Sequence, residues 1–496
     1  MNIQGQKPVC RTGRLKIATW LLALMLMVNF SASGQSLTIH DENSYNSKLS
    51  SGKHRTTKIT FGGLKSFDVE YRGEIEVNAT DTDITSIAPG GYFEVSKTTF
   101  GSKRSIVIEP SAGKLVKEYY EGRSKVAWEP EGRKWLEEIL PDLVRSTGIA
   151  AKSRINRYFK EGGVNAVMNE ISRLESSYVQ SIYGKLLFQK PGLTDNDLIS
   201  AISQLSRDIS SSYYLSQLLE DTSDKFLSKE NTREAYFDAV AKIDSDYYKS
   251  QVLRKAFTGT SPSDAVMSKI MYATSEIGSD YYQSEVLSEL LSMRNLSPNA
   301  LDQIIKATGS IGSDYYQSQV LSKAMKKDGL SAEAFNSLME NVSEIGSDYY
   351  MSQVFSDMLD SRMEEKTLTN MVKLLNRNMD SDYYLSSVLS KMMREQKIEA
   401  NTMAALSEAI ADMSSSTYAA EIIKDASRAD RIEKNTLIAL LQAAGEIDSD
   451  YYLSEALTSL ADHVRASDDE VKKAYREAAR KIGSDTYYGR AVKAID

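Results

Sequence analysis

Residues 277–287 read Ile-Gly-Ser-Asp-Tyr-Tyr-Gln-Ser-Glu-Val-Leu, and this phrase recurs with substitutions from about residue 174 to the C-terminus. Successive copies lie 34 or 35 residues apart. A fixed period of roughly 20 to 50 residues is typical of stacked-repeat proteins, in which each repeat packs only against its neighbours. The first tyrosine of the phrase, or its replacement, falls at ten positions: Tyr178, Tyr213, Tyr247, Tyr281, Tyr315, Tyr349, Tyr383, Thr417, Tyr451 and Thr486.

Each repeat is expected to form two helices joined by the Gly-Ser-Asp part of the phrase. In one central copy, Ser297 precedes a proline, and this pair is typical of a helix N-cap followed by the first helical residue. Gly312 stands where a left-handed C-cap would end the first helix. Ser313 is then expected to cap the second helix, with the charge of Asp314 in its first turn. We therefore expect an α-solenoid of about ten helix-turn-helix repeats over residues 164–496.

Helical geometry separates the two tyrosines of the phrase. At ~100° per residue, Val320 and Leu321 lie on the side opposite Tyr315, and Tyr316 lies on the same buried arc as these two. The serine three residues after Tyr315 and the glutamine that follows it fall on the polar side with that tyrosine. The second tyrosine is thus expected to pack between helices, and the first to face the polar side. The candidate binding stripe consists of Tyr213, Tyr247, Tyr281, Tyr315, Tyr349, Tyr383 and Tyr451.

Two interpretations of this stripe remain open. Tyrosine, serine and glutamine together offer flat amphipathic area and adaptable hydrogen bonds, which suits the recognition of a peptide or glycan. Alternatively, each first tyrosine packs against a neighbouring repeat, with its hydroxyl on a carbonyl or on the aspartate of the next turn. The copy with Ser416, Thr417 and Ala420 interrupts the stripe under either interpretation. The exposure of the rings distinguishes the two.

Upstream of the repeats the hydrophobic pattern changes to a period of two. Residues 67–71, Phe-Asp-Val-Glu-Tyr, alternate in polarity, and later alternating runs are separated by Gly and Pro-Gly-Gly turn signals. This pattern predicts a small antiparallel β-domain of about five to seven strands over residues 35–129. Residues 130–163 show helical spacing, and we expect them to cap the first repeat, because the end of a solenoid otherwise exposes hydrophobic surface.

The first 34 residues have the organisation of a secretory signal peptide. Four basic residues precede the apolar segment 17–30, and the small residues 32–34 follow it. The apolar segment is shorter than the ~20 residues that span a bilayer. We therefore expect residues 1–34 to be removed, with Gln35 as the first mature residue and no membrane span in the mature chain. Cys10, the only cysteine, lies within the removed segment.

The charge and the residue types argue against several functions. Removal of residues 1–34 leaves 56 basic against 68 acidic residues, a formal charge of −12. Such an acidic chain is unlike proteins that bind nucleic acid or anionic membrane surfaces. His40, His54 and His463 are scattered, and no nucleophile, phosphate-binding or dinucleotide-binding motif occurs in a fitting context. We expect no cofactor, no metal and no enzymatic activity.

The repeats resemble two known classes. The period matches the tetratricopeptide repeat, but the Trp and Leu-Gly signature of that class is absent. The spacing of Leu321 and Met325 after Asp314 resembles a HEAT-type unit. Residues 174–492 also resemble the Ser-Asp-Tyr repeats of bacterial extracytoplasmic proteins. These resemblances imply a solenoid and a location in the cell envelope, and they imply no activity.

The sequence therefore predicts an α+β, mainly α, bacterial protein that is exported to the periplasm or the cell surface. Its expected role is that of a non-catalytic scaffold or recognition protein that binds a protein or extended peptide through one face of the solenoid. Two alternatives remain. One is a carbohydrate- or cell-wall-associated protein, which includes a hydrolase with its site between the β-domain and the array. The other is a regulatory or sensor component of an envelope signalling system.

Overall fold

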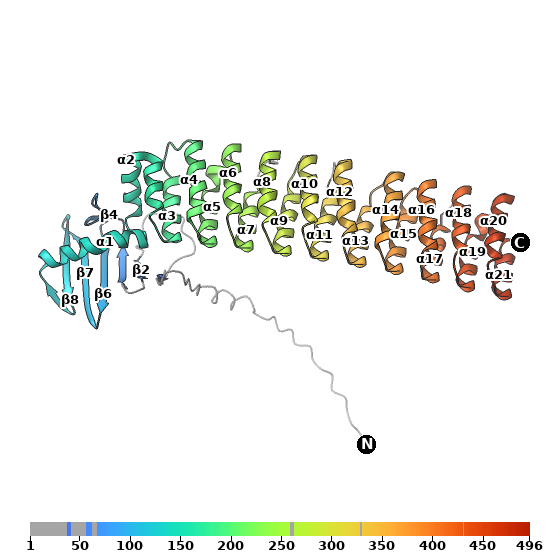
Figure 1. The fold of residues 1–496 in the computed structure, drawn as a ribbon, viewed down its shortest axis with the longest axis horizontal. Coiled ribbons are helices and arrows are strands. Elements are labelled where there is room, and N and C mark those ends of the chain that lie inside the picture. The colour runs from blue at the N-terminus through green and yellow to red at the C-terminus, as the bar shows by residue number, and fades with distance from the viewer. Residues whose placement is uncertain (1–36, 41–55, 62–66, 258–261, 328–329, 430) are drawn as a thin grey trace, which may run out of the picture. The chain divides into compact units, whose positions relative to one another are not determined.

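The computed structural model describes residues 37–40, 56–61 and 67–496, apart from residues 258–261, 328–329 and 430. The expected signal peptide, residues 1–34, lies outside this part of the chain. The chain divides into two compact units, of which the first ends at Leu187 and the second is Phe188–Asp496. An antiparallel β region is followed by a long run of helices, so the fold class is α+β and mainly α, as predicted (Figure 1).

The first unit is built on an antiparallel sheet. Seven strands follow the order β1-β2-β3-β6-β7-β8-β9, and β4 and β5 form a separate hairpin. The described residues thus contain nine strands, two more than the upper end of the expected range. Their bounds are β1 Leu37–His40, β2 Thr56–Phe61, β3 Phe67–Arg72, β4 Ile75–Val77, β5 Ile84–Ile87, β6 Tyr92–Thr99, β7 Ser102–Ser111, β8 Lys114–Glu121 and β9 Ser124–Val126.

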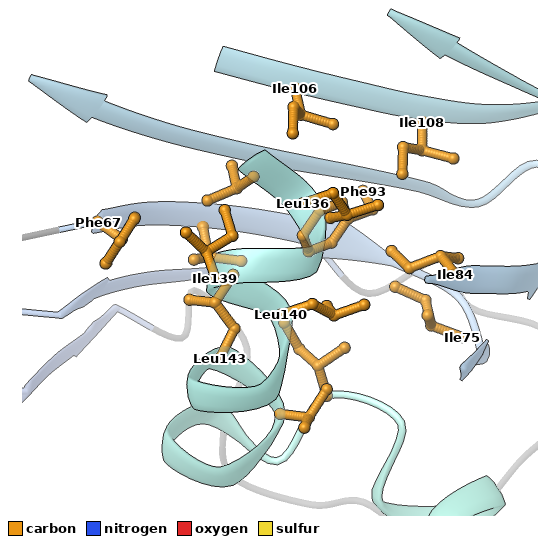
Figure 2. Packing of buried hydrophobic residues seen from close by; sticks show 14 of the residues in the cluster. Phe67, Ile75, Ile84, Phe93, Ile106, Ile108, Leu136, Ile139, Leu140 and Leu143 are labelled. Carbon is orange, nitrogen blue, oxygen red and sulfur yellow. The ribbon is translucent and has the colours of Figure 1, made fainter. Parts of the chain in front are cut away.

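One face of this sheet is covered by helix α1 (Arg133–Thr147), which follows a π-helical turn, η1 (Trp128–Gly132). Strand residues such as Val95 and Ile106 are fully buried, and the helical spacing of Leu136 and Leu140 places both in the same core (Figure 2). Each buried side chain of this size stabilises the fold by roughly 1.5–3 kcal/mol. The apolar face of α1 therefore completes the β-domain core, whereas the sequence predicted that this helix would cap the first repeat.

Two further helices complete the first unit. Helix α2 (Ala151–Ile171) changes direction where Gly162 and Gly163 leave helical geometry. Helix α3 (Ser177–Phe188) contains the first copy of the repeated phrase.

The second unit consists of helices that alternate between two rows (Figure 1). Each first helix of a repeat packs against the first helices before and after it, and each second helix does the same in the other row. The first helices are α4 Asp195–Asp208, α6 Glu230–Ala241, α8 Asp264–Ser275, α10 Pro298–Thr308, α12 Ala332–Ser343, α14 Glu365–Asn378, α16 Ala400–Ala411, α18 Lys434–Ala444 and α20 Asp469–Ala479. The second helices are α5 Ser212–Phe226, α7 Asp246–Ala256, α9 Asp280–Ser292, α11 Asp314–Met325, α13 Asp348–Met358, α15 Asp382–Glu395, α17 Ser416–Ala426, α19 Asp450–Arg465 and α21 Asp485–Ile495.

The core of the array lies between these rows. In α11, Val320, Leu321 and Ala324 are fully buried, as the helical spacing predicts, and Ile304 and Ile305 of α10 are fully buried as well. Repetition of this arrangement places apolar contacts between successive repeats along the array. An array of helical hairpins with a period of 34 to 35 residues is thereby confirmed.

The helix caps agree with the prediction at one end of the repeat and differ at the turn. Ser297 accepts a hydrogen bond from the backbone N–H of Ala300 at 3.0 Å, so it caps α10 as expected. Ser313 occupies the N-cap position of α11 but its side chain makes no capping hydrogen bond. Gly312 was expected to adopt a left-handed conformation, but it is not among the residues with positive φ. A Cβ there would lie 3.5 Å from the carboxylate of Asp280, which is an ordinary van der Waals contact, and Asp380 occupies the equivalent position of another copy.

Candidate binding surface

The aspartate of the phrase connects successive repeats. The backbone N–H of Gly312 donates to Asp280 of the preceding repeat at 3.0 Å. Charge-assisted hydrogen bonds of this kind are stronger than neutral ones. The aspartate was expected to act only on its own helix, and its link to the next turn was missed because that partner lies 32 residues away. The same contact joins Gly278 to Asp246, Gly346 to Asp314 and Gly483 to Asp450. In two further copies the donor is the next residue of the turn, so Ser381 donates to Asp348 and Ser415 to Asp382.

Each tyrosine of the candidate binding stripe is exposed. The exposed fraction of the side chains ranges from 39% at Tyr213 to 56% at Tyr383. A tyrosine in this state keeps much of its ring available for a further contact. The second tyrosines, such as Tyr316, are half-buried rather than fully packed in the core.

The exposed rings also contact the next repeat. The centroid of the Tyr281 ring lies 5.1 Å from that of the Tyr282 ring and 5.7 Å from that of the Tyr316 ring, and both pairs are edge-to-face. Tyr315 contacts Tyr316 and Tyr350 in the same way, at 5.1 and 5.7 Å. A zigzag of edge-to-face rings therefore runs along the second helices from Tyr214 to Tyr418, and we call it the tyrosine ladder.

The two sequence interpretations are thus combined in one arrangement. Each first tyrosine packs against a neighbouring repeat, as the packing interpretation requires, and its ring nevertheless remains about half exposed, as a binding stripe requires. Edge-to-face contacts contribute about 0.5–1.5 kcal/mol each. They hold the ring in one orientation, so the side chain loses less conformational entropy when a ligand binds to it.

The ladder is interrupted at α17. Thr417 replaces the first tyrosine there, so the zigzag ends at Tyr418 and resumes with Tyr451, which contacts Tyr452 and Tyr487. The hydrogen bond to the next repeat survives at this copy, because the side chain of Ser416 accepts from the backbone N–H of Ser449 at 3.3 Å. The stacking of repeats therefore continues where the ladder does not.

The polar partners of the ladder differ from the expected ones. The serine three residues after each first tyrosine was expected on the polar face, but Ser318 is buried and donates to the carbonyl of Tyr315 at 2.9 Å. Ser284 and Ser352 do the same to Tyr281 and Tyr349. The hydroxyls of these serines are engaged within their own helices, so they are not available to a ligand. The polar groups that remain on this face are those one position later, such as Gln319 and Gln353, both of them exposed.

Buried polar side chains two residues after the first tyrosine were not predicted. Gln283 donates to the hydroxyl of Ser310 at 2.6 Å, and the ammonium of Lys249 donates to the carbonyl of Glu276 at 3.2 Å. Burial lowers the pKa of Lys249, with the neighbouring acids opposing that effect. These groups satisfy polar atoms near the turns that end the first helices, so they belong to the interior of the array and not to the ladder.

A buried charged cluster lies in the first unit. The guanidinium of Arg154 is fully buried and donates to Asp81 at 2.8 Å and to Glu170 at 2.6 Å. Arg157 donates to Asp81, and Arg145 to Glu170, each at 2.8 Å. Burial disfavours the charged form of Glu170, but the hydrogen bonds from Arg145 and Arg154 outweigh it and hold the pKa of this carboxyl below its ordinary value. The cluster ties the β4–β5 hairpin to α2, and the sequence did not reveal it because Arg154 and Asp81 are 73 residues apart.

The remaining chemistry is sparse. Among the described residues, no group of three or more His, Cys, Asp and Glu side chains is placed to hold a metal ion. His463 lies 2.9 Å from the carbonyl of Ser427, so it is engaged with the backbone of the preceding repeat. Within the same part of the chain, no helix is both long enough and apolar enough to cross a membrane.

Comparisons with known proteins do not identify a family for this chain. No protein-family model and no curated protein matches the chain. One similar solved structure, described as "Computational Design of Self-Assembling Cyclic Protein Homooligomers", is 14% identical over 67% of this chain and 97% of that chain, with a TM-score of 0.11. Another, "Circular tandem repeat protein with novel repeat topology and enhanced subunit contact surfaces", is 12% identical over 74% and 78%, with a TM-score of 0.14. With TM-scores this low, the assignment of a helical repeat array rests on the chain's own helices and period.

Proposed function

We propose that this protein is an exported, non-catalytic scaffold or recognition protein, which binds a protein or extended peptide partner along the tyrosine ladder. The observation that carries the proposal is the row of half-exposed tyrosines, which repeats at the same position of successive second helices. Soluble proteins rarely expose aromatic side chains in a continuous row unless that row serves an interaction.

The size of each contact favours an extended partner. Covering the exposed half of one tyrosine ring stabilises a complex by roughly 1 kcal/mol, which is small against the cost of association. A partner must therefore cover several rings at once. Because successive rings belong to successive repeats, such a partner has to run along the array.

The location and class are part of the same proposal. The organisation of residues 1–34 supports export through a signal peptide, to the periplasm or the cell surface. The repeated phrase supports a relationship to HEAT-like repeats and to the Ser-Asp-Tyr repeats of bacterial envelopes. The acidic charge disfavours nucleic acid as the partner.

Affinity capture from a cell-envelope fraction tests the proposal. The bait is the processed form that begins at Gln35, compared with the triple variant Y281T/Y315T/Y349T. Threonine is the replacement that the chain itself carries at Thr417. A matched control is Y272T, because Tyr272 is 54% exposed but lies on α8, outside the ladder.

The proposal predicts a protein that the wild type and Y272T retain and that the triple variant releases. Retention of the same proteins by all three baits would overturn it. Retention of a polysaccharide that depends on the same three tyrosines would favour the carbohydrate-associated alternative.

A further inference from the structure

The hairpin between β6 and β7 carries an unusually exposed aromatic residue. Thr99 pairs with Ser102, so Phe100 and Gly101 form a two-residue turn, with φ of 49° and 82°. Two-residue turns with positive φ at both positions favour Asn or Asp followed by Gly. Phe100 is instead fully exposed, at 105% of its reference area, which is the largest value among the exposed large hydrophobic residues of the described chain.

The fold itself does not require this ring. The next hairpin, between β7 and β8, has the same two-residue turn with Ala112 and Gly113, whose φ values are 47° and 77°. An alanine therefore serves the same turn geometry in the same sheet. A phenylalanine at a left-handed position is strained, and Phe100 recovers none of that strain through packing. The ring is thus available only to something outside the chain.

The strands of this hairpin carry basic residues, and the acidic residue beside them is Glu121, which pairs with Arg104 across β7 and β8. Between residues 95 and 108 the chain contains Lys97, Lys103 and Arg104 and no acidic residue. The backbone N–H of Gly122 donates to the carbonyl of Lys103 at 2.7 Å, which brings the turn that contains Arg123 beside Lys103, one residue from the Thr99–Ser102 pair. Lys103 and Arg123 are exposed, and the structure gives neither an ion pair within its described part.

We propose that this hairpin tip binds the surface of an anionic phospholipid bilayer, with Phe100 inserted at the interface and Lys103 and Arg123 against the headgroups. Charge complementarity selects this occupant, because a single exposed apolar ring beside unpaired cations matches an apolar layer under a negative surface. The acidic remainder of the chain is repelled by the same surface, so contact is confined to the tip. The proposal does not depend on the tyrosine ladder.

Vesicle co-sedimentation tests this proposal. The processed form that begins at Gln35 retains every residue that the structure describes and lacks the apolar segment 17–30, which would bind lipid by itself. It is mixed with vesicles of phosphatidylcholine alone or with about one third phosphatidylglycerol. The variants are F100A, F100W and K103A/R123A, with K114A as the control, because Lys114 is an exposed lysine of the other hairpin.

The wild type should sediment with the anionic vesicles and remain in solution with the neutral ones. F100A should bind at least about tenfold more weakly, since one phenylalanine ring leaves the interface. K103A/R123A should bind to the anionic vesicles about twenty-fold more weakly than the wild type, and this difference should be smaller at high salt. F100W and K114A should bind as the wild type does, and F100A should keep its melting temperature because Ala112 already serves this turn.

Equal sedimentation of the wild type with both kinds of vesicle, or unchanged binding of F100A, would overturn the proposal. The proposal would also be overturned if the wild type did not bind to vesicles but formed a dimer that dissociates in the F100A variant. That result would assign Phe100 to a contact between copies of the chain.

Discussion

The two units of this protein are stabilised in different ways. In the first unit, one fully buried guanidinium, that of Arg154, bridges two acidic residues that come from distant parts of the chain. In the array, the same apolar contacts, aspartate hydrogen bonds and ring pairs recur from repeat to repeat. A single substitution should therefore affect the whole of the first unit, but in the array it should weaken only the local repeat and its two interfaces.

The comparison can be repeated within the array, between α11 and α17. Both helices bury their apolar residues and both accept a hydrogen bond from the next repeat, but only α11 carries the first tyrosine of the ladder. The chain thus contains one copy in which the interface between repeats is preserved and the ladder is absent. This difference indicates that stacking and the ladder are separable.

The largest effect is expected from Arg154→Met. This change leaves Asp81 and Glu170 buried without their shared cation, which should cost about 3–5 kcal/mol of the free energy of unfolding of the first unit. In the processed form, tryptophan fluorescence during urea unfolding reports this unit alone, because Trp128 and Trp135 are its only tryptophans.

Arg173→Met is the matched control, since Arg173 is largely exposed and lies 3.8 Å from Glu170. It should change the midpoint little, because exposed ion pairs contribute about 0–1 kcal/mol. Equal losses in the two variants would contradict the role given to Arg154.

Leu321→Ala in α11 should cost about 2–5 kcal/mol, because a fully buried side chain leaves a cavity. Ile423→Ala at the same position of α17 should cost a similar amount, since the two copies share their core. Circular dichroism at 222 nm measures the unfolding of the array. The urea midpoint of the first unit, measured by tryptophan fluorescence, should not change. A much smaller loss in α17 would show that the copy without the ladder is also loosely packed.

The dependence on pH distinguishes the units further. The folded-state pKa of Glu170 lies below its ordinary value of 4.5, so its contribution to stability is complete above that value and is lost as the pH falls through the folded pKa. The difference in stability between the wild type and Glu170→Gln should therefore be largest near neutral pH and narrow below about pH 4.5. Urea midpoints by fluorescence measure it, and a difference that stays constant down to pH 3 would count against this assignment.

A smaller effect is expected from Asp314→Ala, which removes the acceptor for the backbone N–H of Gly346. The site is partly exposed, so we expect a loss of about 1 kcal/mol in the array. Asp314→Ser should recover part of this loss, because Ser212 and Ser416 each accept a hydrogen bond from the next turn in their own copies, from the residue that follows the glycine position. A serine variant no more stable than the alanine variant would contradict the proposed contact.

The sequence predicted whatever depends on period and helical spacing. The positions of the helices and the burial of Leu321 follow from one helix and its repetition, whereas the exposure of the Tyr315 ring was left open. The contacts that it missed join residues whose proximity depends on how elements stack. Asp280 meets Gly312 only because one turn lies over the next, and Ser318 turns back to a carbonyl of its own helix rather than outward.

The first unit was less predictable for the same reason. Alternation identified strands such as residues 67–71, but the cover that α1 provides for the sheet depends on tertiary packing. Arg154 stands in an ordinary polar stretch of α2, and nothing local marks it as the centre of a buried cluster.

The most direct test of the central claim is the free energy of unfolding of Y281T/Y315T/Y349T, measured by urea titration at 222 nm. Suppose that the ladder is a surface for a partner and that the repeats are held by their core and by the aspartate contacts. Each substitution then removes two ring contacts and should cost about 1 kcal/mol, the lower end of their range, because the rings are about half exposed. The triple variant should then lose about 3 kcal/mol and remain a cooperatively folded array. A loss at each site as large as that of Leu321→Ala would contradict the account, because it would assign the ladder to the core of the array.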